Sequence, residues 1–227
     1  MNKSPGSSDE NWWEPYTTRG LYPGFADFLA IETRATAVDL FGAFIPGLLQ
    51  TEQYAKELFK QFKAITPDAP SGIKLRLARQ WHAFERPEPL RVHAVIDEVT
   101  LLRVMGNAQV QYEQLIHLRR LSDLPHITIQ ILPIGGGVVP PLLVAQLAIY
   151  IFHFSDTPYP TISVEAIWDT RHSTNTTEVG AYQKTFVELR VQALDTEKSA
   201  LMIEDIARKI LNHYPETNDR RTEDSGE

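Results

Sequence analysis

Two arginines and a glutamine on one predicted helix are the side chains best placed to bind an anion. Arg76 and Arg79 are three residues apart and Gln80 is four from Arg76, so all three share one helix face. Such a face clamps a carboxylate or phosphate through paired hydrogen bonds. The alternative is a salt bridge to an acid of the same chain, Glu32 or Glu98. The pattern predicts either a ligand-binding face or an internal ion pair.

Two adjacent carboxylates follow a predicted strand and are candidate catalytic groups. Asp97 and Glu98 come directly after an alternating apolar run, where ligands bind in open sheets. In an enzyme one of them would act as a general base, with His82 as a further candidate. Alternatively, Asp97 caps the helical turn that begins at Val99. The catalytic residues are therefore unknown, with these three as candidates.

Residues 46–51, Pro-Gly-Leu-Leu-Gln-Thr, form a tight corner between two predicted helices. Thr51 stands where the next helix needs its N-cap, and Tyr54 begins that helix's apolar face. A helical corner explains most of this motif. The Gln50 amide can additionally recognise the donors and acceptors of a ligand.

Tryptophans mark two further candidate surfaces. Trp12 and Trp13 stand in an otherwise polar segment, and two exposed indoles would form an uncovered apolar patch. They therefore dock on the body of this chain or on a partner. The full set of candidate ligand-binding residues is Gln50, Tyr54, Arg76, Arg79, Gln80, Trp81 and Trp168.

Several functional classes are excluded by what the sequence lacks. It contains no cysteine, so it has no disulfide, thiolate nucleophile or sulfur-based zinc site. None of the seven histidines falls at a familiar metal-ligand spacing, and no nucleotide-binding or hydrolase motif is present. We expect neither a metal nor another cofactor. Gly135–Gly137 predicts a flexible loop, with a lid or an anion contact as the alternative.

The charge distribution argues against direct nucleic-acid binding. The net charge is −7, from 22 basic and 29 acidic residues, and most of the excess acid lies at the two ends. The nearly neutral body offers no basic stripe for phosphates. No secretory signal or membrane-length apolar run is visible, so we expect a cytoplasmic protein without a membrane partner.

The pattern predicts one α+β domain over residues 12–213, with a disordered leader at 1–11 and a disordered acidic tail at 214–227. A helical N-terminal third is expected to pack on a small mixed sheet of about four strands, closed by two C-terminal helices. The first two strands flank a helical crossover, which favours parallel pairing. Expected helices cover residues 24–43, 51–62, 73–84, 99–104, 108–122, 177–194 and 196–211, and expected strands cover 91–96, 127–132, 145–154 and 161–167.

The ordered set of motifs resembles a known family. The entry segment Trp12-Trp13-x-x-Tyr16, the corner at 46–51, Arg76-x-x-Arg79-Gln80 and Asp97-Glu98-x-x-Leu101 occur in the order of that family. It is the actinobacterial domain of unknown function that follows an XRE-type helix-turn-helix in Scr-like, antitoxin-type transcriptional regulators. The resemblance spans about residues 12–211. This chain has no room for the helix-turn-helix, which is either trimmed away or naturally absent. Met1 and the polar leader favour a stand-alone copy.

The resemblance implies an effector module that binds a small molecule or a small partner protein. Without a DNA-binding domain, such a chain would act by binding a partner, and the sequence also allows a homodimer. The alternative is a cofactor-free cyclase or isomerase of secondary metabolism built on the same domain. Such an enzyme needs only a shaped apolar pocket and one or two titratable groups.

Overall fold

A mixed six-stranded sheet lies at the centre of the chain, which we describe from a computed structural model covering residues 11–16, 23–61, 69–136, 139–144, 146–166 and 169–213. Its strand order is β3-β2-β1-β4-β5-β6. The strands are β1 Ala37–Gly42, β2 Arg91–Asp97, β3 Ile127–Leu132, β4 Ala148–His153, β5 Thr161–Glu165 and β6 Thr170–Ser173. β1, β2 and β3 run parallel, as expected for the last two, whereas β4, β5 and β6 pair in antiparallel fashion.

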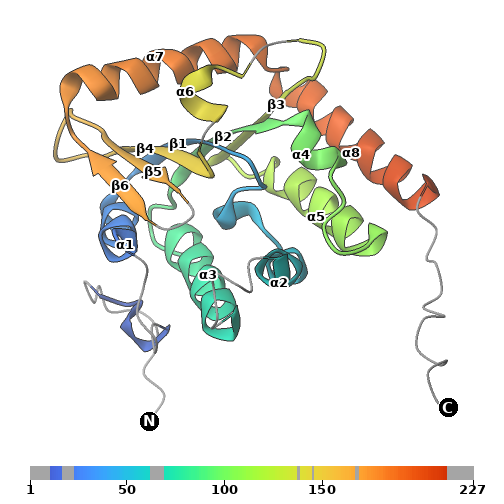
Figure 1. Ribbon diagram of the computed structural model, residues 1–227, viewed down its shortest axis with the longest axis horizontal. Helices are drawn as coiled ribbons and strands as arrows, with labels where there is room; N and C mark the ends of the chain where they lie inside the picture. The colour runs from blue at the N-terminus through green and yellow to red at the C-terminus, as the bar shows by residue number, and fades with distance from the viewer. Residues whose placement is uncertain are drawn as a thin grey trace, which may run out of the picture.

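Helices cover both faces of this sheet (Figure 1). On one face pack α1 Phe25–Arg34, α2 Glu52–Gln61, α3 Ala69–Phe84, α5 Ala108–Leu121 and α8 Thr196–His213. On the other lie α6 Pro141–Val144 and α7 Thr176–Gln192. Short helices complete the described chain: α4 Glu98–Leu102 and the 3₁₀ turns η1 Glu14–Tyr16 and η2 Gly47–Leu49. The result is a three-layer arrangement of mixed α and β structure.

The N-terminal third is not wholly helical, which corrects our prediction of one helix over residues 24–43. The helix ends at Arg34, and Ala35 has extended backbone angles. The next residues form β1, a central strand between β2 and β4. Because a central strand is buried on both faces, Phe41 is buried along with Val38 and Leu40. The burial of neighbouring Leu40 and Phe41 breaks the alternation of apolar and polar residues by which a strand is recognised in a sequence.

The prediction of about four strands also falls short because β1 and β6 were missed. β6 has only four residues, and Thr170, Arg171, His172 and Ser173 carry no apolar alternation. Its place in the sheet comes from antiparallel pairing with β5. The predicted strands at 91–96 and 127–132 are confirmed, as are the helices beginning near Thr51, Ala108, Thr177 and Thr196.

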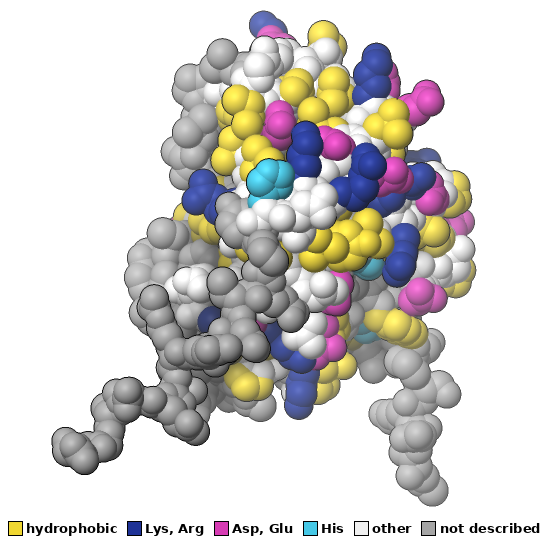
Figure 2. Space-filling model, turned by 90° about the vertical axis from the view of Figure 1, so that its right-hand side faces the viewer, with side chains coloured by type: hydrophobic (Ala, Val, Ile, Leu, Met, Phe, Trp, Pro, Cys, Tyr) yellow, Lys and Arg dark blue, Asp and Glu magenta, His cyan; other side chains and the backbone are white. Residues whose placement is uncertain are grey.

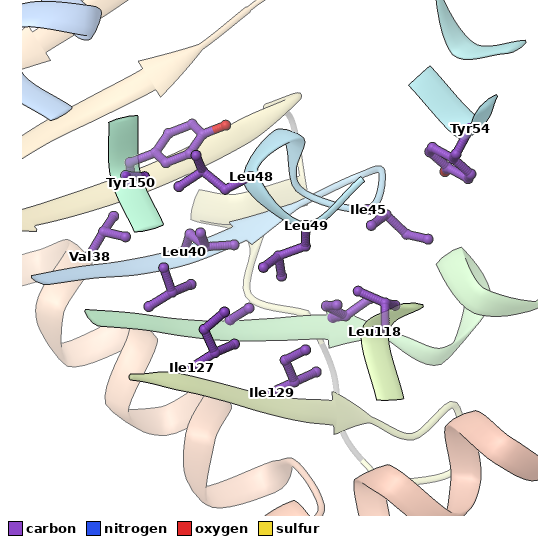
Figure 3. Packing of buried hydrophobic residues seen from close by; sticks show 14 of the residues in the cluster. Val38, Leu40, Ile45, Leu48, Leu49, Tyr54, Leu118, Ile127, Ile129 and Tyr150 are labelled. Carbon is purple, nitrogen blue, oxygen red and sulfur yellow. The ribbon is translucent and has the colours of Figure 1, made fainter. Parts of the chain in front are cut away.

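The corner at residues 46–50 is packed into the core rather than lying over it. Ile45, Leu48 and Leu49 are buried, and Figure 3 shows their side chains between the sheet and the surrounding helices, with Leu48 beside Tyr150 and Ile45 on the Leu118 side. Thr51 caps α2, because its Oγ1 accepts a hydrogen bond from the Tyr54 amide at 3.2 Å. The corner is therefore fixed by the core on one side and by a cap on the other.

Basic, acidic and apolar side chains are interspersed on the face shown in Figure 2, so no single sign of charge dominates it. Within the described ranges, no helix has both the length and the apolar character needed to cross a bilayer.

Candidate functional site

The corner at 46–50 is held by the side chain of Gln80 on α3. Its Nε2 donates to the carbonyl oxygens of Gly47 and Gln50, each at 2.8 Å. These two carbonyl oxygens have no hydrogen-bond partner within the short η2 turn. The Gln80 side-chain amide therefore supplies bonds that the backbone cannot make. Gln80 thus serves this chain's own backbone.

Gln50 uses both ends of its amide inside the protein. Its Nε2 donates to the Ile45 carbonyl at 2.6 Å, and its Oε1 accepts from Arg76 Nη1 at 2.6 Å. The Arg76 guanidinium lies 5.2 Å from the ring centre of Phe59. A Cβ built on Gly47 would lie 3.4 Å from Arg76 Cζ, at ordinary van der Waals distance, so the guanidinium also packs beside this glycine.

Arg79, one turn further along α3, forms a buried ion pair with Glu32 of α1. Its Nε and Nη2 donate to the two carboxylate oxygens at 2.8 and 2.7 Å, and the side chains are only 4% and 5% exposed. The guanidinium also lies 4.9 Å from the centre of the Phe28 ring. Of the two alternatives, Arg79 therefore makes the internal ion pair, with Glu32 rather than Glu98.

Tyr150 of β4 lies where the charged groups of this region meet. Its hydroxyl donates to Glu165 Oε2 across a long 3.4 Å contact. Burial is the main cause that raises the pKa of Tyr150 well above its usual range. Four charged groups also act on this hydroxyl, two carboxylates raising the pKa and two arginines lowering it: Glu165, Arg79, Glu32 and Arg76.

Tyr54 is buried in the same half of the core, on α2. Burial raises the pKa of Tyr54 to about 12. A hydrogen bond with the Ile45 backbone and the charge of Arg76 lower this pKa, but by less than burial raises it. Trp81, on α3, is 39% exposed. Trp168, the other predicted tryptophan contact, lies outside the described residues. The structure thus brings together Gln50, Arg76 and Gln80, with Arg79 behind them and Tyr54 nearby.

Two buried glutamines on α5 complete this network, and we did not predict them. Gln114 accepts from the Thr51 amide at 2.7 Å and donates to the Leu49 carbonyl at 2.8 Å. Gln111 bonds in the same way to the Met105 amide and the Leu101 carbonyl. Their signal was present in the sequence, because both occupy the apolar face of the helix that also carries Leu115 and Leu118.

His82 and the entry tryptophans pack against one another. Trp12 stacks on the His82 ring with centroids 4.1 Å apart, and its Nε1 donates to Thr33 Oγ1 at 2.9 Å. Trp12 and Trp13 are 9% and 5% exposed. Burial lowers the pKa of His82. Both indoles therefore dock on the body of this chain, the first of the two alternatives, whereas contact with a partner stays a prediction.

Asp97 and Glu98 lie at the carboxyl end of β2, and each bonds to backbone. Asp97 Oδ1 accepts from the Val99 amide at 2.9 Å and caps α4, as the alternative interpretation expected. Glu98 Oε2 accepts from the Ile134 amide at 2.9 Å. Neither carboxylate is a hydrogen-bond partner of Arg79 or His82, so the structure does not gather the catalytic candidates into one constellation.

A serine–histidine pair on β5 and β6 was also missed. Ser163 Oγ lies 2.8 Å from His172 Nδ1, and His172 Nε2 lies 2.8 Å from the Gly24 carbonyl oxygen. This pattern resembles an activated nucleophile. However, Ser163 is fully buried, so the pair joins β5 and β6 to the start of α1.

The described residues hold no group of three or more His, Asp or Glu side chains arranged to bind a metal ion. The glycine loop is a turn in which the Gly136 amide donates to the Pro133 carbonyl at 3.0 Å. Gly137 lies outside the described residues, as do residues 1–10 of the expected leader and the whole expected tail.

Fold and site together define a three-layer domain in which buried charges lie between a central sheet and its α1–α3 cover. The chain belongs to the family described as a domain of unknown function, DUF5753, whose model matches residues 25–205. No curated protein and no solved structure matches the chain. The resemblance is confirmed at the level of this domain, and the link to regulators stays a prediction.

Proposed function

We propose that this chain is an effector-type module that binds a small molecule or a small partner protein beside α3. We further propose that it is related to the C-terminal domains of XRE-type, antitoxin-like regulators of actinobacteria, acts in the cytoplasm and does not bind DNA itself. Arg76 and the exposed Trp81 would contact the ligand, and Gln50, Gln80, Arg79 and Tyr54 would position them from behind. Trp168, outside the described residues, stays an expected contact.

The buried ion pair of Arg79 and Glu32, which lies near the buried Tyr150 hydroxyl, carries this proposal. A buried ion pair adds little stability over apolar residues of similar volume. Ionisable groups with displaced pKa values gather at functional sites more often than elsewhere. Placing Arg79 and Glu32 in the core, next to Tyr150, is therefore better explained by a site than by stability alone.

Arg76 supplies the contact that a ligand would use. Its guanidinium lies over the Phe59 ring, 5.2 Å from the ring centre, and is oriented by Gln50. A planar guanidinium is the kind of group that binds carboxylate or phosphate. Gln80 and Gln50 hold the neighbouring corner rigid, so little ordering is needed on binding. An anionic group is the expected ligand feature.

Asp97 and Glu98 accept hydrogen bonds from the Val99 and Ile134 amides, and His82 stacks on Trp12. These contacts give the enzyme alternative no comparable support. Binding without turnover is therefore the better-supported proposal.

A thermal-shift measurement with host extract separates the two kinds of ligand. We expect the low-molecular-mass filtrate to raise the melting temperature of the wild type. A ligand present at a hundredfold excess over its Kd adds about 2.7 kcal/mol to the free energy of unfolding. Arg76→Ala should lose this shift, and Lys74→Ala, an exposed change on the same helix, should keep it. A shift produced only by the retained protein fraction would favour the partner protein. No shift with either fraction, or an equal shift in Arg76→Ala, would contradict the proposal.

A further inference from the structure

The outer face of α7 carries apolar residues that nothing in the described chain covers. Its inner face packs on the sheet through Val179, Tyr182, Phe186 and Leu189. Turning about 100° per residue, the opposite stripe contains Gly180, Lys184, Val187 and Val191. Val187 and Val191 are 54% and 81% exposed. Figure 1 shows α7 along one side of the sheet, its outer side directed away from the other labelled elements.

A solvent-facing stripe of this composition is unfavourable for a helix in isolation. Valine is a poorer helix former than the charged residues usual at exposed positions. Each exposed valine also forfeits the free energy that burial would supply. The two neighbouring valines therefore make this stripe a candidate contact surface for another molecule.

We propose that this stripe is a homodimer interface in which α7 of a second copy packs antiparallel across a two-fold axis. In such a pair, positions equidistant from the axis face each other. An axis level with Phe186 places Lys184 opposite Glu188 of the copy, and Glu188 opposite Lys184 of the copy. Both side chains are exposed, so one register forms two reciprocal ion pairs.

The same register accommodates the bulk of the valines. It places Val191 over Gly180 and Ala181 of the copy, where the helix surface is narrowest. A Cβ added at Gly180 would meet no heavy atom within 4 Å, which shows that this point of the surface is open. Val187 then lies nearest the axis. In the antiparallel pair with its axis level with Phe186, both charge and shape are therefore self-complementary. For this reason we assign the surface to a second copy of this chain.

A single helix pair buries less than the roughly 1,600 Å² of a standard interface. The dimer is therefore expected to dissociate on dilution. Analytical ultracentrifugation of the full chain over a concentration series should give a reversible monomer–dimer equilibrium. A monomer at every concentration would overturn the proposal.

Charge and bulk variants locate the interface. Val191→Lys should shift the equilibrium to monomer, whereas Leu201→Lys, a matched change at an exposed apolar residue of α8, should not. Lys184→Glu should weaken the dimer at least tenfold in Kd, and the exchange Lys184→Glu with Glu188→Lys should restore it. A dimer unchanged by Val191→Lys, or not restored by the exchange, would overturn this interface.

The absence of cysteine permits a direct test of the axis. In the proposed pair, position 187 is one residue from the axis, so Val187→Cys brings the only thiol of each copy close to the other. A disulfide requires a Cα separation of about 4.4–6.8 Å. We expect mild oxidation to give a covalent dimer. Leu201→Cys is the matched control and should stay monomeric under the same conditions. Equal cross-linking of the two variants would contradict the antiparallel α7 pair.

Discussion

Arg79 and Glu32 form a two-bond ion pair that joins α3 to α1 within the core. The pair lies under the rings of Phe25 and Phe28, whose centres are 5.7 and 4.9 Å from the Arg79 guanidinium. Glu32 has two good donors and Arg79 a matched acceptor, so neither charge is left uncompensated. Removing one partner is therefore far more damaging than removing both.

Single and double substitutions of this pair test its energetic character. Arg79→Met and Glu32→Met should each lower the free energy of unfolding by about 3–5 kcal/mol, because each leaves one buried charge. The double variant should recover most of that loss. Urea denaturation of the four proteins gives the coupling energy, and a double variant as unstable as the sum of the singles would contradict this assignment.

The position of Arg79 shows what spacing can and cannot predict. The sequence places Arg76, Arg79 and Gln80 on one helix face. It does not tell which of them turns to a ligand and which to Glu32, since that depends on how α3 lies against α1. The ion pair was one of two predicted alternatives, but its burial under aromatic rings follows only from the packed structure.

Gln114 should be a strong contributor to stability. Gln114→Leu leaves the Thr51 amide and the Leu49 carbonyl without this partner, at about 1–3 kcal/mol for each buried group left unsatisfied. Chemical denaturation measures the loss. Gln109→Leu, on the exposed side of the same helix, is the control and should change stability by less than about 0.5 kcal/mol. Comparable losses in both variants would mean that the two hydrogen bonds of the Gln114 side chain do not hold the corner at residues 46–50.

Asp97 is expected to act as a helix cap. Asp97→Ala should cost about 1 kcal/mol of stability, because the Val99 amide loses its acceptor. Asp97→Asn keeps the acceptor and should remain close to wild type in the same thermal melts. If Asn were as destabilising as Ala, the negative charge rather than the cap would be the contribution of Asp97.

His82 should make the protein less stable in acid. Burial lowers the pKa of His82 below its ordinary 6.5, so the unfolded chain binds the proton more readily. The contribution of His82 to the free energy of unfolding is therefore fully present above about pH 6.5. It is lost as the pH falls from there through the lowered pKa. His82→Phe keeps an aromatic ring against Trp12 without a titrating group. Urea unfolding at about pH 7 and about pH 5 should show a smaller acid loss for this variant.

His93 and His117 also have pKa values lowered mainly by burial, so the His82→Phe variant should retain part of the acid loss. An acid loss identical to that of the wild type would contradict the assigned role of His82.

The fold was predictable where local pattern and tertiary position agree. Ile127 to Leu132 alternates in sequence and in burial, and Asp97 stands where α4 needs its cap. β1 follows a helix and is buried on both faces, so its apolar residues continued the helical spacing. β6 is defined by its neighbour β5 rather than by its own residues. His172, on β6, was missed for the same reason.

Native mass spectrometry of the chain, purified gently from its own host, tests the central claim of a binding module most directly. We predict that the wild type retains a small molecule or a small protein. Arg76→Ala should lose that species, and Lys74→Ala should keep it. A bare mass for the wild type, or a species retained equally by Arg76→Ala, would contradict a binding site beside α3.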